Sequence, residues 1–464
     1  MSSEESEWEQ ATTWKMLSYS FGGLVYTAST TAISVAIFYY YEVEIGMPVV
    51  LLGLAIAIYG LYNMFNDPIF AYLTDRPFKW TKKWGMRFPW MMLGIFPPLL
   101  FYYFLYAVPE NLITSSDPWP LFWYVLIMLC LIDTFYSILN PHLNGGVANQ
   151  FRTEFERRKF TAIRSTIPGL LSLPLAMIVP FIVVYGKRET FVFAATLAVI
   201  VWFVFAILFI PGAQESEKLK ETFIRSYEST TKTFWKTLKT GLGRKNFAIS
   251  LIVITLYYVA GILYVASGIY FMKDIVRLPL IYSIFTTMAY FFGFIIGVPL
   301  WTKYAKKKGF KKTYVLGLLM MALSYLPVLW ITTIEEAVFF GFIGGFVSSC
   351  VIIMFAPIVA DCYDDVATIT GTHDEATLQG IRSFFITICV LVYGPIIAIV
   401  HIIFGYNPDP NAIQTPLAIW GIRVHMGVIP MILIFLAFFI AYKWYDLEGA
   451  KKQEVIAKLK DMGL

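Results

Sequence analysis

Charged residues are scarce in this sequence. Asp, Glu, Lys and Arg make up 14% of its 464 residues, whereas about 25% is usual in a soluble domain, and 58% of the residues are hydrophobic. This composition excludes an ordinary soluble chain and predicts a polytopic membrane protein. Aromatic residues reach 18%, which favours helices in lipid over a barrel of alternating strands.

Cysteine and the motifs of enzyme chemistry are also scarce. The four cysteines, Cys130, Cys350, Cys362 and Cys389, have no CxxC spacing, so neither a disulfide framework nor a zinc site is expected. HExxH, Walker A, GxSxG and helix-opening GxGxxG patterns are missing. We therefore expect no enzyme, no metal site and no cofactor. Satisfied or solvent-facing roles are expected for the four histidines, His142, His373, His401 and His425.

Apolar segments long enough to cross a bilayer recur along the chain. About 20 helical residues cross ~30 Å of hydrocarbon, which predicts twelve spans at residues 17–41, 49–74, 88–108, 119–148, 160–185, 191–211, 246–272, 279–302, 313–333, 337–360, 381–404 and 417–442. The acidic N-terminal segment does not resemble a signal peptide, so the first span should be retained.

The longest polar connection predicts two halves. Residues 212–245 follow the sixth span, so six-helix bundles are expected at 1–211 and 246–464, joined by a cytoplasmic linker. The triplet Ile-Arg-Ser opens the penultimate helix of each half, at 163–165 and 381–383. Parallel repeats of this kind are common in transporters.

Lys and Arg in the short loops predict the orientation. They concentrate at residues 76–87, 152–159 and 303–312 and in the C-terminal tail at 443–452, whereas the alternate loops are acidic or nearly neutral. By the positive-inside rule, both termini should be cytoplasmic in a cell-membrane protein. KKKGFKK is then a membrane anchor rather than a nucleic-acid patch.

Few ionisable residues fall within the predicted spans. Asp67, Asp133 and Arg423 are internal, and Arg164 and Arg382 lie near cytoplasmic span ends. A charge at membrane depth costs at least ~2.5–3.5 kcal/mol, so such residues usually face a cavity on a substrate or ion path. They indicate a carrier.

Asp67 is the strongest candidate for an ion site. It lies about 12 Å inside its span at 1.5 Å of rise per residue, and Asn63 and Asn66 lie close to it on the helix. These oxygens suit Na⁺, and the carboxylate could instead carry a proton. In a structural alternative, the only role of Asp67 is an ion pair with Arg164.

A second acidic candidate lies in span 4. Asp133 shares a face with Asn140 and is either a hydrogen-bond acceptor for the substrate or a satisfied core residue.

Four segments in order resemble a known family. NDPIFAYLTDRPFKWTKKWGMRFPW, FERRKFTAIR, ADCYDDVATITGTHDEATLQGIRSFF and GIRVHMGVIP resemble signatures of the glycoside-pentoside-hexuronide:cation symporters, the melibiose permease group of the major facilitator superfamily. The resemblance implies alternating access and a sugar or glycoside carried with Na⁺ or H⁺. Asp67 matches the family's cation-site carboxylate, Asn140 a sugar-contacting position and Arg164 an arginine facing the cavity.

Two departures leave alternatives open. Asn63 replaces a second family aspartate, and Thr387 replaces a lysine expected in span 11. Coupling to H⁺, coupling with Asn63 as a neutral ligand, and the absence of coupling therefore all stay open. Lysolipid carriers of the same superfamily share the signatures, so an amphiphile carrier is an alternative, as is a non-transporting receptor.

The remaining candidates concern the substrate cavity and its gate. Substrate contacts are predicted for Asp133, Asn140, Arg164, Tyr26, Trp123 and Tyr136. Gating is predicted for Asp75, Arg76, Asp361, Asp364, Asp365 and Arg382, with the acids after residue 360 in a loop that pairs with Arg or Lys of neighbouring helix ends. The expected partners are a small-molecule substrate and membrane lipids, without nucleic acid, for a monomeric protein.

Overall fold

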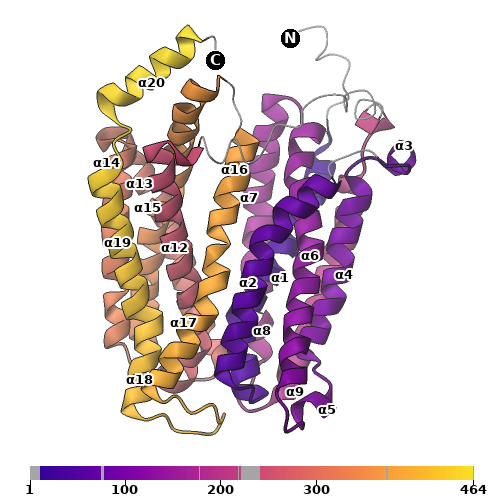
Figure 1. Ribbon diagram of the computed structural model, residues 1–464, viewed down its shortest axis with the longest axis vertical. Coiled ribbons are helices and arrows are strands. Elements are labelled where there is room, and N and C mark those ends of the chain that lie inside the picture. Colours follow the sequence, from indigo (N-terminus) through magenta and orange to yellow (C-terminus); the bar gives the residue numbers. More distant parts are fainter. Residues whose placement is uncertain are drawn as a thin grey trace. The chain divides into compact units, whose positions relative to one another are not determined.

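The computed structural model describes residues 11–74, 78–176, 178–217, 219–220, 241–371 and 375–462, and every regular element within these ranges is a helix. Within the part of the chain that the structure describes, eleven segments are long and apolar enough to cross a membrane. Figure 1 shows these helices running alongside one another within each unit. They coincide with eleven of the twelve predicted spans, and the predicted span at 160–185 falls on the consecutive helices α7 and α8. The predicted all-α membrane fold is therefore confirmed.

The helices follow the predicted order. The first six spans correspond to α1 (Thr13–Tyr39) with the π-helix η2 (Tyr40–Glu44), α2 (Val49–Thr74), α4 (Phe88–Tyr106), α6 (Trp119–Gln150), α7 (Glu154–Ala176) with α8 (Ile178–Ile182), and α9 (Arg188–Ala213). The last six correspond to α12 (Lys245–Tyr270) with the π-helix η3 (Phe271–Val276), η4 (Leu280–Tyr282) with α13 (Ser283–Lys308), α14 (Phe310–Ser324) with η5 (Leu326–Leu329), α15 (Ile334–Thr370), α16 (Glu375–Ile386) with α17 (Ile388–Phe404), and α18 (Pro416–Arg423) with the π-helix η6 (Val424–Val428) and α19 (Ile429–Trp444). Short helices α3 (Thr81–Trp84) and α5 (Glu110–Ile113) lie between spans, and α20 (Gly449–Asp461) follows the last one.

The chain divides into two compact units. The first comprises Met1–Tyr40, Glu44–Met47 and Phe65–Thr231, and the second comprises Tyr41–Val43, Pro48–Met64 and Lys232–Leu464. The early part of α2 thus groups with the C-terminal helices, because its glycines allow close contact with α17. A Cβ added at Gly60 would come within 2.4 Å of the Leu391 backbone. The predicted boundaries at 211 and 246 stay a prediction, and most of the linker lies outside the described residues.

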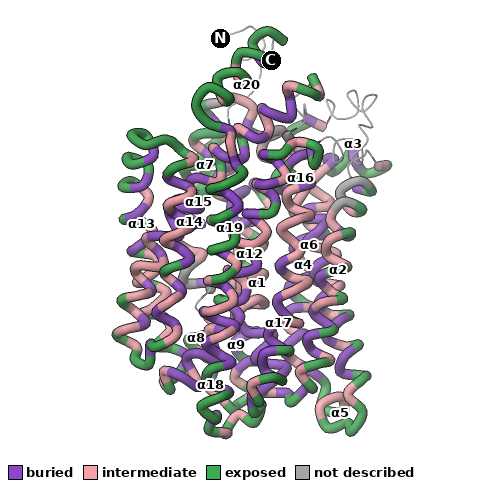
Figure 2. Tube along the Cα trace, turned by 60° about the vertical axis from the view of Figure 1, so that its left-hand side comes forward, coloured by how far each residue is buried: buried purple, intermediate pink, exposed green. Residues whose placement is uncertain are grey.

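Small residues bring α13 and α15 together in the second unit. A Cβ at Gly293 would lie 2.0 Å from the Phe342 carbonyl oxygen, and one at Gly345 would lie 1.8 Å from the Tyr290 carbonyl oxygen. Gly297 follows Gly293 by four residues on α13, and Gly341 precedes Gly345 by four residues on α15. This spacing permits close backbone approach between membrane helices. The remaining surface of α13 is largely uncovered, as Figure 2 shows, which suits a helix that faces lipid.

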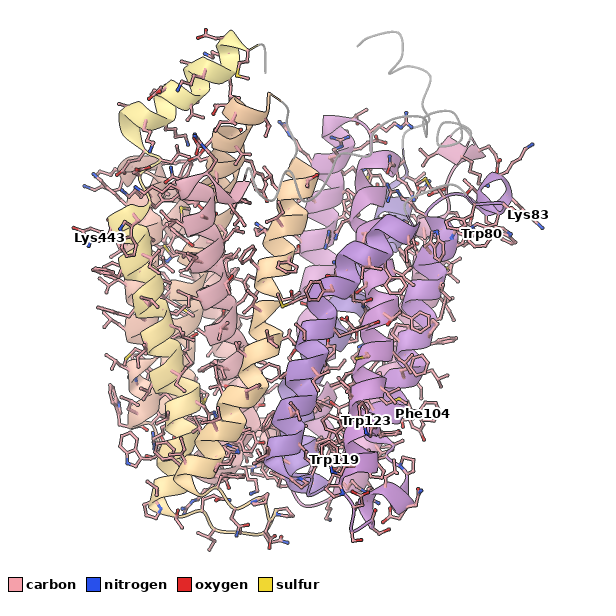
Figure 3. The ribbon with its side chains drawn as sticks, viewed as in Figure 1. Trp80, Lys83, Phe104, Trp119, Trp123 and Lys443 are labelled. Atoms are coloured by element: carbon pink, nitrogen blue, oxygen red, sulfur yellow. The ribbon has the colours of Figure 1, made fainter. Side chains whose placement is uncertain are left out.

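Aromatic and basic side chains mark the two ends of the first unit. Lys83 of α3 and Trp80, which directly precedes this helix, lie at one end, and Trp119 lies at the start of α6 at the opposite end (Figure 3). Both tryptophans are exposed, at 40% and 49%. Tryptophan prefers the interface between hydrocarbon and water, so these residues are suited to anchor the unit in a bilayer.

The loop predicted for the acids after residue 360 is wrong, because these residues are helical. Asp361, Asp364 and Asp365 lie on α15, which continues to Thr370 and ends where Gly371 adopts φ +68°. The reason is that neither Gly nor Pro occurs between Asp361 and Thr370 to interrupt the helix. Glycine at the end of the helix then supplies the left-handed conformation that terminates it.

Arg423 has a structural role that the sequence did not indicate. Its guanidinium donates to the carbonyl oxygens of Val328 at 2.5 Å and Ile331 at 2.9 Å. These carbonyls lie at and just beyond the end of η5. The arginine therefore satisfies acceptors that a helix end leaves without partners.

Candidate functional site

A polar cluster connects α2 and α6 within the first unit. Asn66 donates from its amide nitrogen to Asp133 Oδ2 at 2.9 Å and to Ser137 Oγ at 2.9 Å. Ser137 in turn donates to Asp67 Oδ1 at 2.5 Å. Two carboxylates are thus connected through one amide and one hydroxyl, and Asn66 and Asp133 are only 3% and 7% exposed.

The hydrogen bonds define what the cluster offers a ligand. Asn66 uses both amide hydrogens and Ser137 uses its hydroxyl hydrogen, so these donors are already occupied. The oxygens of two carboxylates and an amide supply negative charge and lone pairs. Hard cations prefer oxygen ligands, and a desolvated carboxylate readily takes up a proton. The cluster is therefore suited to either a monovalent cation or a proton.

The structural alternative of an Asp67–Arg164 pair is not observed among the described residues. Asp67 bonds to Ser137 instead. Arg164 lies on α7 next to α1, where a Cβ added at Gly23 would be 3.5 Å from its Nη2. Its side chain is exposed, together with Thr161 and Ser165 of the same helix. Exposed polar residues within a predicted span usually face a water-filled cavity.

Aromatic residues of α1 and α6 lie beside the carboxylates. The Tyr136 hydroxyl forms a hydrogen bond with Ser29 Oγ, and the Tyr26 ring packs edge-on against the Tyr136 ring at a centroid distance of 5.2 Å. Tyr136 is buried and Tyr26 is half-buried. Tyr26 also interacts electrostatically with Asp67 and Asp133, so the structure brings these two predicted substrate residues together with the carboxylates.

The other predicted residues of α2 and α6 lie elsewhere on these two helices. Asn140 is half-buried and accepts from Asn144 at 2.8 Å. Trp123 is 54% exposed near the start of α6 (Figure 3), and its ten-residue separation from Asp133 corresponds to about 15 Å of helix. Asn63 is half-buried, one turn before Asp67 on α2.

Sequence reasoning missed two serines of the site. Ser137 follows Asp133 by four residues, and helical spacing places both on one face. That spacing could have identified Ser137. Ser29 has no comparable signal, because its partner Tyr136 lies on a different helix.

The predicted gating residues fall into three groups. Asp365 forms a bidentate ion pair with Arg244, at the start of α12, and Asp361 pairs with Lys452 of α20 at 2.6 Å. Asp364 and Arg382 are half-buried. Asp75 and Arg76 lie outside the described residues. A gating role stays a prediction for the entire set.

The signature WGMR is explained by a contact with Glu215. The two carboxylate oxygens of Glu215 accept from the backbone N–H groups of Met86 at 2.7 Å and Arg87 at 2.9 Å, directly before α4. Gly85 has φ +95°, and a Cβ there would lie 2.1 Å from Glu215 Oε2. Burial raises the pKa of Glu215, although these two N–H groups partly counteract the shift.

A carboxylate cluster within helices that can cross a membrane is typical of membrane transporters. The family described as MFS/sugar transport protein matches residues 18–449, and the chain belongs to this family. Its relatives are transporters rather than enzymes. The membership predicted from the four sequence segments is therefore confirmed.

Two curated relatives match part of the chain. "Uncharacterized symporter sll1374" of Synechocystis sp. is 29% identical over 145 residues, which cover 29% of this chain and 26% of the relative. "Glucuronide carrier protein homolog" of Escherichia coli is 22% identical over 196 residues, which cover 42% of each chain. The matched regions thus span less than half of either relative.

Solved transporter structures share the fold. The nucleoside transporter NupG superposes with a TM-score of 0.59 at 13% identity, covering 93% of this chain and 99% of the other. A bacterial homolog to the human lysosomal transporter Spinster superposes with a TM-score of 0.59 at 14% identity, covering 93% and 96%. At these identities, the likeness shows the fold alone.

Proposed function

We propose that this transporter carries a small polar solute, a sugar or glycoside, by alternating access, and that Na⁺ or H⁺ bound at Asp67 drives the transport. The single observation that carries the proposal is the Asn66–Ser137 bridge between Asp67 and Asp133. The printed names of the two relatives, a symporter and a glucuronide carrier homolog, support it. The orientation with both termini in the cytoplasm is part of the proposal, as is the monomeric state.

The coupling chemistry follows from the two bridged carboxylates. A cation at Asp67 would compensate the buried negative charge, and its release would leave that charge uncompensated. Ser137 fixes one Asp67 oxygen by donating to it, so ion binding needs little reorganisation of that side chain. Because Asn66 contacts Asp133 as well as Ser137, a change at the ion ligand is transmitted to a proposed substrate residue.

The substrate proposal rests on the polar and aromatic residues around the cluster. Asp133 accepts hydrogen bonds from the hydroxyl groups of the solute. Arg164 is exposed in the same unit, and its planar guanidinium donates hydrogen bonds to the solute. Tyr26 supplies a half-buried aromatic ring next to Tyr136. Rings of sugars commonly stack on such aromatic faces, whereas a lysolipid needs a phosphate partner and an apolar opening for its chain.

Uptake into proteoliposomes tests the coupling. Asp67→Asn should abolish the stimulation of uptake by a Na⁺ or H⁺ gradient while retaining part of the exchange activity, because the amide cannot hold the compensating charge. Asp409→Asn, at an exposed loop position, is the control that removes the same charge. Full gradient stimulation in the Asp67 variant would refute the ion site.

The same preparation separates the substrate classes. A panel of sugars, glycosides and lysolipids is compared in the wild type, Asp133→Asn and Arg164→Lys. A hydroxyl-rich substrate should depend on Asp133, and either class should be sensitive to loss of the planar guanidinium. Sugar binding that is indifferent to both substitutions would refute the solute assignment, and saturable uptake of lysolipids alone would favour the amphiphile carrier.

A further inference from the structure

A second buried polar cluster lies in the second unit. It comprises Glu42 of η2, Ser267 and Tyr270 of α12, His401 of α17 and His425 of η6. None of these five side chains is more than 3% exposed. His401 and His425 have the satisfied rather than the solvent-facing role that the sequence predicted as alternatives, and the fold brings the two rings together.

The cluster is a continuous chain of hydrogen bonds. Glu42 Oε1 lies 2.8 Å from His401 Nδ1, and the His401 and His425 Nε2 atoms are 3.2 Å apart. His425 Nδ1 lies 2.6 Å from Ser267 Oγ, which also bonds to the Leu263 carbonyl oxygen at 2.5 Å. The Tyr270 hydroxyl donates to Glu42 Oε2 at 2.5 Å.

Charged groups around the chain are already compensated or directed elsewhere. Asp274 of η3 pairs with Lys273 at 3.1 Å and accepts from Tyr406, whose ring stacks on His401 at 4.3 Å between centroids. Arg423, two residues before His425, donates to backbone carbonyls of the η5 region. Among the described residues, Glu42 contacts Tyr270 and His401 rather than Lys or Arg, so its charge has to be compensated within the chain of hydrogen bonds.

Counting hydrogens shows what the chain requires. The four contacts Glu42–His401, His401–His425, His425–Ser267 and Ser267–Leu263 each need one hydrogen. An ionised Glu42, two neutral imidazoles and the serine hydroxyl supply three. One further proton completes all four bonds and changes the charge of the cluster from −1 to zero. A buried group without net charge avoids the large desolvation cost of an uncompensated carboxylate.

We propose that Glu42, His401 and His425 form a proton-binding site that takes up one proton, independently of the ion site proposed at Asp67. The bound proton is shared along the chain, on an imidazole or on the Glu42 carboxyl. Its loss leaves one bond unmade and a buried charge. Since Glu42 belongs to the short segment Tyr41–Val43 that groups with the second unit, the proton stabilises the position of that segment.

π-helical turns at this site fit a functional role. Glu42 lies in η2, Lys273 and Asp274 lie in η3, and His425 lies in η6. A π-turn is less favourable than regular α-helix and is frequent at functional sites. Two of them, η2 and η6, supply members of the cluster, and η3 places Asp274 beside Tyr406, whose ring stacks on His401.

Glu42→Gln is the decisive variant because it completes the bonds without a proton. Its amide nitrogen can donate to His401 Nδ1, its carbonyl can accept from Tyr270, and the two neutral imidazoles and Ser267 supply the other hydrogens. Purified wild type and variant are unfolded in SDS at fixed pH values between 6 and 8, and proton exchange is measured with an indicator dye in weak buffer. Ordinary glutamate is ionised in the unfolded chain over this range. The wild type should therefore release about one proton more than Glu42→Gln.

Glu44→Gln is the matched control. Glu44 ends the same π-helix but accepts from Gly186 N–H outside the chain, so this variant should match the wild type. Equal proton exchange for the wild type and Glu42→Gln throughout the range would overturn the proposal.

A second measurement needs only the wild type: nitrogen NMR and infrared spectroscopy should detect one protonated imidazole or one neutral buried carboxyl. Two neutral rings with an ionised Glu42 at every pH would also overturn it. Neither result depends on uptake, so the Asp67 proposal stands or fails separately.

Discussion

Replacing Glu215 by Ala should destabilise the start of α4, because a single side chain there serves two backbone groups. The carboxylate accepts from Met86 N–H at 2.7 Å and Arg87 N–H at 2.9 Å, and the residue is 7% exposed. Hydrogen bonds to charged groups contribute ~1.5–3 kcal/mol each. Burial of the carboxylate offsets part of this sum, as its raised pKa indicates. We expect a net loss of about 2–3 kcal/mol in the free energy of unfolding, somewhat above the ~0.5–2 kcal/mol of an ordinary helix cap.

SDS-induced unfolding followed by tryptophan fluorescence measures this loss. Glu217→Ala is the control, because Glu217 is an acid two residues away that forms only an exposed ion pair with Lys220. Such pairs contribute ~0–1 kcal/mol. An equal effect of the two substitutions would refute the capping role of Glu215.

A double-mutant cycle with Gly85 tests the geometry itself. Gly85→Ala should be destabilising for two reasons, the backbone conformation at φ +95° and the clash of the new Cβ with Glu215. Glu215→Ala removes the clash and leaves only the backbone cost, about 1–3 kcal/mol. The two substitutions should therefore be non-additive, and strictly additive losses would contradict the observed contact.

The raised pKa of Glu215 also predicts the pH dependence. A glutamate titrates near 4.3 in an unfolded chain, and burial raises the pKa in the folded protein. Between these two values the folded state holds a proton that the unfolded state has lost. Stability from this group is therefore present below about pH 4.3 and decreases as the pH rises through the folded-state pKa. The destabilisation by Glu215→Ala should consequently be larger at pH 4 than at pH 8, and the opposite trend would contradict this sign.

Three further predictions concern the helices and the ion site. Gly60→Ala should destabilise by about 1–3 kcal/mol through the close contact with α17, whereas Gly261→Ala, with nothing within 4 Å of the new Cβ, should stabilise by about 0.5–1 kcal/mol; chemical unfolding distinguishes them. Arg244→Ala should cost about 3–5 kcal/mol by leaving the Asp365 side chain, 3% exposed, without its cation, and adding Asp365→Asn should restore part of the loss. Ser137→Ala should lower the cation concentration for half-maximal uptake by up to about tenfold, because a charge-assisted hydrogen bond of ~1.5 kcal/mol that stabilises the cation-free Asp67 carboxylate is lost; an unchanged value would exclude this serine from the ion site.

Hydrophobicity and helix length were sufficient to predict most of the architecture. As predicted, α2 begins at Val49 and α6 begins at Trp119. These limits are readable because a membrane helix must satisfy its backbone internally over a fixed thickness, so its length and apolar character are encoded locally. The same reasoning identified Asp67 and Asp133 as costly and therefore functional candidates.

What the sequence could not determine is which side chains meet between helices. Composition and spacing placed Asn66, Asp67 and Asp133 in spans 2 and 4, but only the packing of α2 against α6 makes Asn66 and Ser137 a bridge. His401 is 359 positions from Glu42, and no local pattern relates two residues so distant. Their contact depends on the rotation and crossing of several helices, and these are set by tertiary packing, including glycine contacts whose effect becomes visible only when the neighbouring backbone is in place.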